Sequence, residues 1–316
     1  MLVFHSEMIN LQNIKNYEQM KNFYHLFANG DEAGGFIVCE SDYVYEFNLI
    51  GICAWITGAI VLSFSLEDSH PHILLYGKHE QIITFLRTFE QASLKHICVT
   101  RGSRDGVTLE CELCLIEDES YLRNVAAYTI VQPTKDGRPV MHYDYRWGTG
   151  SMYFRPENHR SIWRMGKDGE SLEAVPFGEM TAREKKSLAG RYGIPDDWLV
   201  CNGIILPENY VDVKLFEKIF LTHNCFRVFT ASGRSQLSVV QDTMAKIRGI
   251  GIEDDVARKY CADLALEKFG TKDIHRMRAD RRLDLARALQ TKYGISYRQL
   301  HNLLKIKEDE LRKYIK

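Results

Sequence analysis

The stretch FSLEDSHPHILLYG, residues 64–77, decides the fold that we expect for this chain of 316 residues. It predicts two strands, residues 59–66 and 71–76, joined by the polar turn Glu67-Asp68-Ser69. His70 and His72 are separated by one residue, so an extended backbone sends both imidazoles to the same face of a sheet. Two imidazoles on one face can share a divalent metal ion.

The neighbouring segments predict helices and one further strand. Apolar spacing and start signals place helices over residues 42–55 and 79–94, a strand over 107–116, and a helix from about 120 to 131 that Pro133 ends. The order helix-strand-strand-helix-strand-helix predicts an α+β fold, in which helices pack on one face of an antiparallel sheet.

The helix after residue 120 carries the second group of candidate residues. Tyr128 and Gln132 are four residues apart and therefore share one helical face. If that face packs over His70 and His72, two imidazoles and an amide oxygen could bind Mg²⁺ or Mn²⁺ beside the phenol. A phenol with a pKa of about 10 is a weak nucleophile at neutral pH, so it needs a phosphate activated by a Lewis acid. The product would be a phosphotyrosine.

Three segments resemble, in the same order, the motifs of the single-tyrosine HUH transposases, and within them the REP-associated tyrosine transposases. They are SHPHILL at 69–75, YTIVQPTKDG at 128–137 and DYRWGT at 144–149. The resemblance covers roughly residues 35–155. It departs from the family at Pro71, where a bulky apolar residue is usual, at Glu67-Asp68-Ser69, which stands in place of Met-Pro-Asn, and at Gly148-Thr149, in place of two serines.

The resemblance implies a ferredoxin-like HUH nuclease fold followed by an all-α C-terminal region. It implies that His70, His72 and Gln132 hold Mg²⁺ or Mn²⁺. Tyr128 would then attack single-stranded, hairpin-forming DNA and leave a 5′-phosphotyrosine and a free 3′-hydroxyl. The expected activity is that of a transposase or nickase, and pairing as a homodimer is possible in such a family.

Other interpretations stay open. The histidines could be an ordinary polar strand face and Tyr128 a packed aromatic, which would leave a domesticated DNA-binding protein with the same fold. A metal-dependent phosphoesterase without a covalent step is a weaker alternative, because nothing in the sequence supplies a general base near the histidines.

The C-terminal end has a different charge from the rest. Residues 272–316 hold 13 Lys and Arg against 6 Asp and Glu, although the net charge of the chain is −1. From residue 281 the pattern predicts a helix-turn-helix unit for DNA, with Glu308-Asp309-Glu310 opposing that role. The side chains expected to meet phosphates are Arg276, Arg278, Arg281, Arg282, Arg298 and Lys305. We therefore divide the chain into a catalytic domain (1–155), a helical accessory region (156–270) and a DNA-binding tail (271–316).

The cysteines and the apolar segments indicate the cellular compartment. Eight cysteines at irregular spacing predict free thiols in a reducing environment. The first residues resemble no secretory signal, and the longest apolar run, 49–62, is shorter than the roughly 20 residues that span a bilayer. We expect a cytoplasmic protein without a membrane partner.

Overall fold

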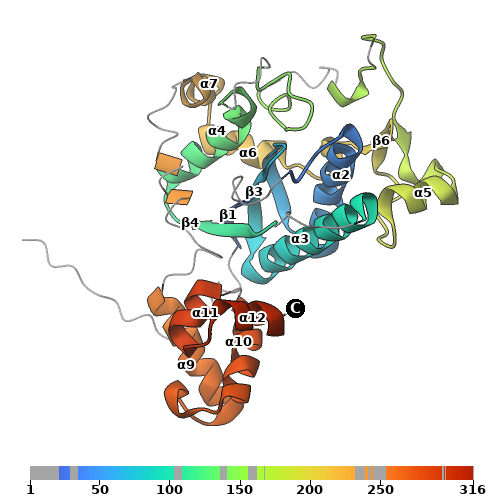
Figure 1. The fold of residues 1–316 in the computed structure, drawn as a ribbon. Helices are drawn as coiled ribbons and strands as arrows, with labels where there is room; N and C mark the ends of the chain where they lie inside the picture. Colours follow the sequence, from blue (N-terminus) through green and yellow to red (C-terminus); the bar gives the residue numbers. More distant parts are fainter. Residues whose placement is uncertain are drawn as a thin grey trace, which may run out of the picture.

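A computed structural model gives the fold of this chain. The residues that it describes are 21–28, 35–102, 109–135, 141–155, 162–166, 168–231, 239–240, 243–244, 254–293, 295 and 297–315. They form a part built on a sheet and, beside it, a helical C-terminal unit (Figure 1).

The larger sheet has four strands, in the order β2-β3-β1-β4. The strands are β1 (Lys21–Ala28), β2 (Ile60–Leu66), β3 (Pro71–Lys78) and β4 (Cys111–Ile116). All neighbouring pairs are antiparallel, which confirms the expected α+β class. Strand β1, which was not predicted from the sequence, lies in the middle of the sheet and pairs with both β3 and β4.

Helices cover both faces of this sheet, so the prediction that they pack on one face is wrong. The helices α2 (Glu40–Thr57) and α3 (His79–Arg101) lie on one side and α4 (Glu119–Lys135) on the other (Figure 1). Along β3, Ile73 and Leu75 join the core under α2 and α3, whereas Leu74 joins the core under α4. Since three successive apolar residues of one strand point to alternate faces, both faces need cover.

Two helix ends differ from the prediction. Pro133 does not end α4, which continues to Lys135. A proline in the last turn removes only one backbone hydrogen bond, so the helix tolerates it there. The helix predicted over 79–94 continues to Arg101, while Gly58, with φ of 68°, ends α2 as expected.

Residues 162–231 are not wholly helical, contrary to the predicted accessory region. They contain a second antiparallel sheet of β5 (Val175–Pro176), β6 (Leu199–Cys201) and β7 (Ile204–Ile205). Asn48 of α2 holds this sheet, because its side chain bonds the Gly203 carbonyl and the Ile205 N–H, each at 2.8 Å. The helices here are α5 (Ala182–Ala189), α6 (Val213–Phe220) and α7 (His223–Ala231), with 3₁₀ turns at Ile162–Arg164, Phe177–Glu179 and Pro207–Asn209.

Two further predictions concern this region. Thr181 and Glu184 have the spacing that predicts a capping box, and the structure confirms it at the start of α5. The sequence pattern also predicts a helix over residues 235–248, which lies mostly outside the described residues. Phe216, Ile219 and Phe220 of α6 pack into the core under α4, so α6 and α4 cover the same face of the large sheet.

The C-terminal unit is a helical bundle with its own core. It comprises α9 (Asp254–Phe269), a 3₁₀ turn (Ile274–Arg276), α10 (Ala279–Tyr293), α11 (Tyr297–Leu304) and α12 (Glu308–Tyr314). The tail from residue 281 is therefore helical, as its sequence pattern predicts. Cys261 and Leu264 of α9 pack in the same core as Leu285, Leu300 and Leu311. The domain boundaries stay predictions, but this packing joins α9 to the tail.

Contacts between the bundle and the sheet part come from α10 and α12. Arg87 of α3 donates to the Gln290 carbonyl, and Arg312 pairs with Glu110 just before β4. No helix among the described ranges is both long enough and apolar enough to cross a membrane.

Candidate active site

Of the two histidines of the HPH motif, His70 immediately precedes β3 and His72 is the second residue of that strand. Their ring centroids are 4.7 Å apart, so the imidazoles share one face of the sheet, as the spacing predicts. His72 is fully buried, whereas His70 is half-buried with its Nδ1 2.7 Å from the Ser69 hydroxyl. The same face of β3 carries Leu74, which packs under α4. The histidines therefore point toward the helix that carries Tyr128.

Tyr128 reaches this pair from α4. Its ring stands edge-on to the His72 ring, with centroids 5.1 Å apart and planes at 85°. The two residues are 56 positions apart in the chain, and their contact depends on α4 covering this face of the sheet. Tyr128 is only 2% exposed, so its phenol is enclosed in this conformation. A DNA strand could reach the hydroxyl only if the cover opened.

Gln132 follows one helical turn after Tyr128 and supplies a buried oxygen. It is 5% exposed, and its Oε1 has no hydrogen-bond partner in the part of the chain that the structure describes. A buried acceptor without a donor loses its hydration and gains nothing in exchange, which costs about 1–3 kcal/mol. An amide oxygen left in this state fits the role of a ligand to a hard cation. The described residues contain no group of three His, Cys, Asp or Glu placed to hold a metal ion.

A third histidine, His25 of β1, belongs to the same group. Its Nε2 lies 3.2 Å from His72 Nδ1, the two rings stack at 26°, and the Tyr128 ring is 6.2 Å away. Complete burial and the nearby His70 lower the pKa of His25 to about 3, so this imidazole is neutral at pH 7. His25 was not predicted as a site residue because β1, which carries it, was not predicted. The signal available was the alternation of residues 21–28, in which Phe23, His25 and Phe27 share one face.

A buried carboxylate lies at the end of β2, opposite the first histidine. Glu67 is 1% exposed, its N–H donates to the His70 carbonyl at 3.0 Å, and its Oε1 accepts from the Ser65 hydroxyl at 2.7 Å. Ser65 is the cross-strand partner of His72. Glu67 is thus an acidic neighbour of the histidines, a role that neither its place in the predicted turn nor its departure from the motif indicated.

The third motif segment, DYRWGT, packs against the outer edge of β2. The Leu66 N–H donates to the Trp147 carbonyl at 2.9 Å, and the Tyr145 hydroxyl donates to the Leu66 carbonyl at 2.5 Å. Thr149 N–H donates to the Phe64 carbonyl at 3.0 Å. These bonds fix the strand end that precedes the histidines, so all three motif segments meet at one end of the sheet.

Tyr121, the other tyrosine of α4, lies in a less suitable place for a nucleophile. Its hydroxyl is 4.0 Å from the Cys114 sulfur, and burial raises its pKa above the ordinary value of 10.0. Burial also raises the pKa of Cys114 to about 11, so neither group ionises readily at neutral pH.

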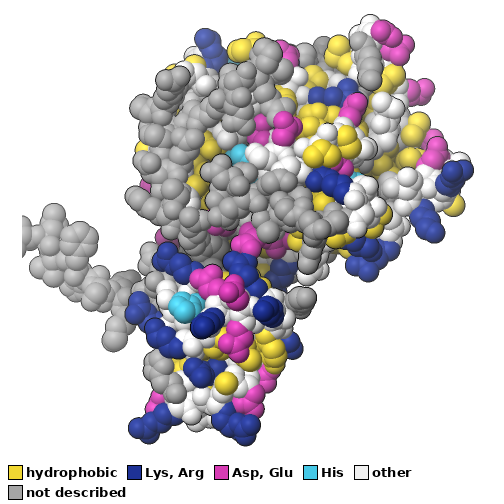
Figure 2. Space-filling view, viewed as in Figure 1, with side chains coloured by type: hydrophobic (Ala, Val, Ile, Leu, Met, Phe, Trp, Pro, Cys, Tyr) yellow, Lys and Arg dark blue, Asp and Glu magenta, His cyan; other side chains and the backbone are white. Residues whose placement is uncertain are grey.

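The expected phosphate contacts of the tail differ in their surroundings. Arg276 and Arg278 are highly exposed, at 90% and 82%, and pair with Asp273 and Asp280. Arg281, Arg298 and Lys305 are exposed as well. Arg282 donates to the Leu304 carbonyl at 2.9 Å and so fastens α10 to the end of α11. Figure 2 shows Lys and Arg over the visible face of this unit with Asp and Glu among them.

Comparison with known proteins gives no match: no family model, no curated protein and no solved structure is significantly similar to this chain. The geometry of the site and the motif resemblance therefore carry the functional argument.

Proposed function

We propose that the chain is a metal-dependent tyrosine transposase or nickase that cleaves and transfers single-stranded DNA through a 5′-phosphotyrosine at Tyr128. In this proposal the four-stranded sheet with α2, α3 and α4 is a ferredoxin-like domain of the HUH nuclease type. The observation that carries it is the contact of the Tyr128 ring with the His72 ring, because the resemblance assigns these two residues to one reaction.

His70, His72 and Gln132 would hold Mg²⁺ or Mn²⁺. The ion would neutralise charge on the scissile phosphate and orient the phosphorus. Gln132 fits this role because its Oε1 is buried without a donor among the described residues. Two imidazole nitrogens and one amide oxygen leave positions open for phosphate oxygens.

The reaction needs one bond to form and one to break. The Tyr128 oxygen would attack the phosphorus, and the bond from phosphorus to the 3′ oxygen of the preceding nucleotide would break. The phenol loses its proton and the departing 3′ oxygen gains one, so no net proton is consumed. Tyr128 must leave its buried position to meet the phosphate, since it is 2% exposed.

A second candidate function follows from that burial. A chain in which Tyr128 and His72 stay enclosed would bind DNA without cutting it, as a domesticated protein of the same fold. The exposed arginines of the C-terminal unit, Arg276 and Arg278 among them, support DNA binding under either proposal. The salt dependence of binding tests this part, because each phosphate contact contributes a slope of about −0.7 to −0.9 in log K against log salt.

The deciding experiment uses labelled single-stranded hairpin DNA with Mn²⁺ or Mg²⁺. We expect the wild-type protein to form a labelled adduct that survives a denaturing gel, and Tyr128→Phe to form none, because that change removes only the attacking oxygen. Tyr121→Phe is the matched control on the same helix and should keep the adduct. An adduct that persists in Tyr128→Phe would reject the assigned nucleophile. DNA binding without any adduct in the wild type would favour the non-catalytic binder.

A further inference from the structure

His25 and His72 form a pair that the motif resemblance does not assign. His25 lies on β1 and His72 on β3, both are fully buried, and one nitrogen of each ring meets the other at 3.2 Å. The contact uses Nε2 of His25 and Nδ1 of His72. The remaining ring nitrogen of His72 is therefore Nε2, on the opposite side of its imidazole from His25.

Only one of the two nitrogens in this contact can carry the shared proton. If His25 donates, His72 has its proton on Nε2 and cannot bind a metal ion through that atom. If His72 donates from Nδ1, its Nε2 keeps a lone pair for the ion. The partner of one imidazole nitrogen thus decides whether the other can be a ligand.

We propose that His25 is a positioning residue that accepts the Nδ1–H of His72 and thereby keeps the Nε2 lone pair of His72 available to the ion. This inference rests on the proposed metal site and adds to it a residue outside the three motifs. His25 does not touch the ion in this arrangement. It fixes the tautomer and the ring orientation of a ligand.

Two observations show that the ring of His25 is held in the orientation that this role requires. The near-parallel stacking of the rings, 26° with centroids 5.3 Å apart, fixes their relative orientation. Phe27 packs on the His25 ring at 5.0 Å and Tyr128 closes its edge at 6.2 Å, so rotation of the ring is restricted.

The tautomer can be observed directly. In the full-length protein with saturating Mg²⁺, long-range ¹⁵N–¹H NMR correlations of the histidine rings should show His72 protonated on Nδ1 and His25 unprotonated on Nε2. A His72 ring protonated on Nε2 would overturn the inference. This measurement is made on the wild-type protein and needs no mutant. Mg²⁺ is the suitable ion for it because Mg²⁺ is diamagnetic.

Binding of Mn²⁺ supplies the second test. His25→Met keeps the length of the side chain but removes the acceptor, whereas the Oε1 of His25→Gln can replace it. We expect the affinity for Mn²⁺, measured by calorimetry without DNA, to fall about 10–100-fold in His25→Met and to change only a few-fold in His25→Gln. A purely structural role would not produce this split.

The outcomes separate this inference from the proposed function. Wild-type protein that binds no Mn²⁺ would reject the metal site itself. Wild-type binding that His25→Met leaves unchanged would reject only the positioning role, as would an equal loss in both variants. Unfolding by urea without metal shows whether each variant is folded, and His25→Gln alone still tests the acceptor if His25→Met does not fold.

Discussion

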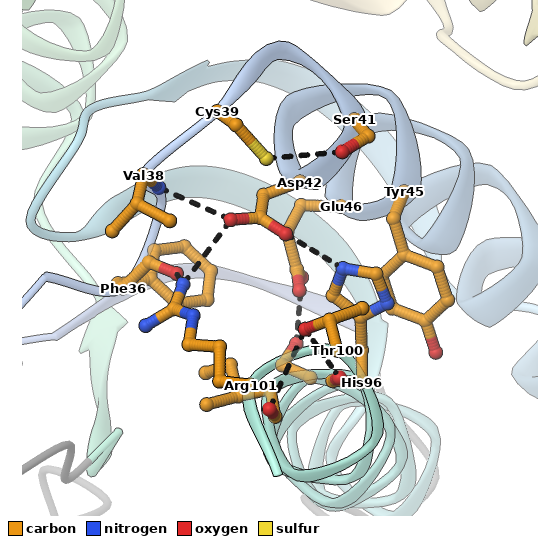
Figure 3. Close-up of polar contacts among 12 residues, drawn as sticks. Phe36, Val38, Cys39, Ser41, Asp42, Tyr45, Glu46, His96, Thr100 and Arg101 are labelled. Atoms are coloured by element: carbon orange, nitrogen blue, oxygen red, sulfur yellow. Dashed lines mark hydrogen bonds and ion pairs between the residues drawn. The ribbon is translucent and has the colours of Figure 1, made fainter. Parts of the chain in front are cut away.

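Buried polar side chains lie under the helices on both faces of the large sheet, and the two groups differ in how their acceptors are satisfied. Between α2 and α3, Asp42 is 2% exposed and has partners on both carboxylate oxygens. His96 meets Oδ1 at 2.8 Å, and Arg101 and the Val38 N–H meet Oδ2 at 3.1 Å (Figure 3). Under α4, Gln132 has an Oε1 without a donor among the described residues.

This difference indicates that the group around Asp42 stabilises the fold, whereas the group around Gln132 is suited to bind a ligand. A satisfied buried network orders the structure, whereas an acceptor left without a donor lowers stability unless something else binds it. Burial alone would raise the pKa of Asp42, but the hydrogen bonds from Val38, His96 and Arg101 outweigh burial and lower it. Both carboxylate oxygens of Asp42, under α2 and α3, thus already have partners within the protein. The group under α4 is completed only by a ligand, according to the proposal above.

The largest expected effect is on the satisfied group. Asp42→Ala removes the partner of His96 and one partner of Arg101, and breaking a buried ion pair costs about 3–5 kcal/mol. We expect a loss near the lower end, because Arg101 keeps the carbonyls of Gly35 and Phe36. Urea unfolding measures the change. The exposed Asp197→Ala is the control, expected within about 0.5 kcal/mol of wild type. If Asp42→Ala lost no more stability than the control Asp197→Ala, the network would not be stabilising.

The second prediction concerns pH and the same two helices. Burial raises the pKa of Glu46, which accepts from the Ser93 hydroxyl, to about 8, and burial likewise raises that of Glu90 to about 8. Between the ordinary value of 4.5 and about 8, the unfolded chain ionises these carboxyls while the folded protein keeps them protonated. The folded state then holds more protons, so stability falls as pH rises through this range.

Glu46→Gln should reduce the loss of stability that accompanies rising pH. An amide cannot ionise and can still accept from Ser93, so the variant gains stability relative to wild type as pH rises from 5 to 8. Urea midpoints at several pH values measure it, with the exposed Glu173→Gln as a control that leaves the slope unchanged. A slope in Glu46→Gln equal to that of wild type would mean that Glu46 is ionised in the folded protein.

The sequence predicted the local parts of the fold well. Strands β2 and β3 and the helices of the tail follow from periodicity and from stop signals such as Gly58. Strand β1 was missed because its signal is short and its pairing partners, residues 71–78 and 111–116, are distant in the chain. The side of the sheet that α4 covers also depends on tertiary packing, which no local pattern specifies.

The candidate site shows the same division. The spacing of His70 and His72, and of Tyr128 and Gln132, follows from strand and helix periods, so each pair could be predicted. The pattern of residues 21–28 can indicate a strand, but the place of His25 beside His72 depends on strand pairing and that of Glu67 on burial, which no local pattern specifies. The burial of Tyr128 also had no sequence signal, since a phenol on a helix face can be exposed or enclosed.

The smallest expected effect is on the unsatisfied group, and it sharpens the comparison most. Gln132→Met replaces a buried amide by an apolar side chain of similar length. Because the Oε1 lacks a donor among the described residues, the change removes a desolvation cost. We expect the free energy of unfolding without metal to stay within about 1 kcal/mol of wild type or to rise. Asp42→Ala, also at a buried position, should lower the free energy of unfolding by several times as much as Gln132→Met changes it.

Added Mn²⁺ should reverse the order of stability, so that wild type becomes more stable than Gln132→Met. A ligand that binds only the folded state stabilises it by about 2.7 kcal/mol at 100 times its dissociation constant, so wild type should gain stability with Mn²⁺. Gln132→Met lacks one ligand atom and should gain less at the same concentration. Urea unfolding with and without Mn²⁺ measures both increments, and Asp42→Asn is the control outside the site that should keep the full increment. Equal increments in wild type and Gln132→Met would show that Gln132 is not a metal ligand. Its Oε1 would then be one of the few buried polar atoms without a partner that folded proteins ordinarily contain.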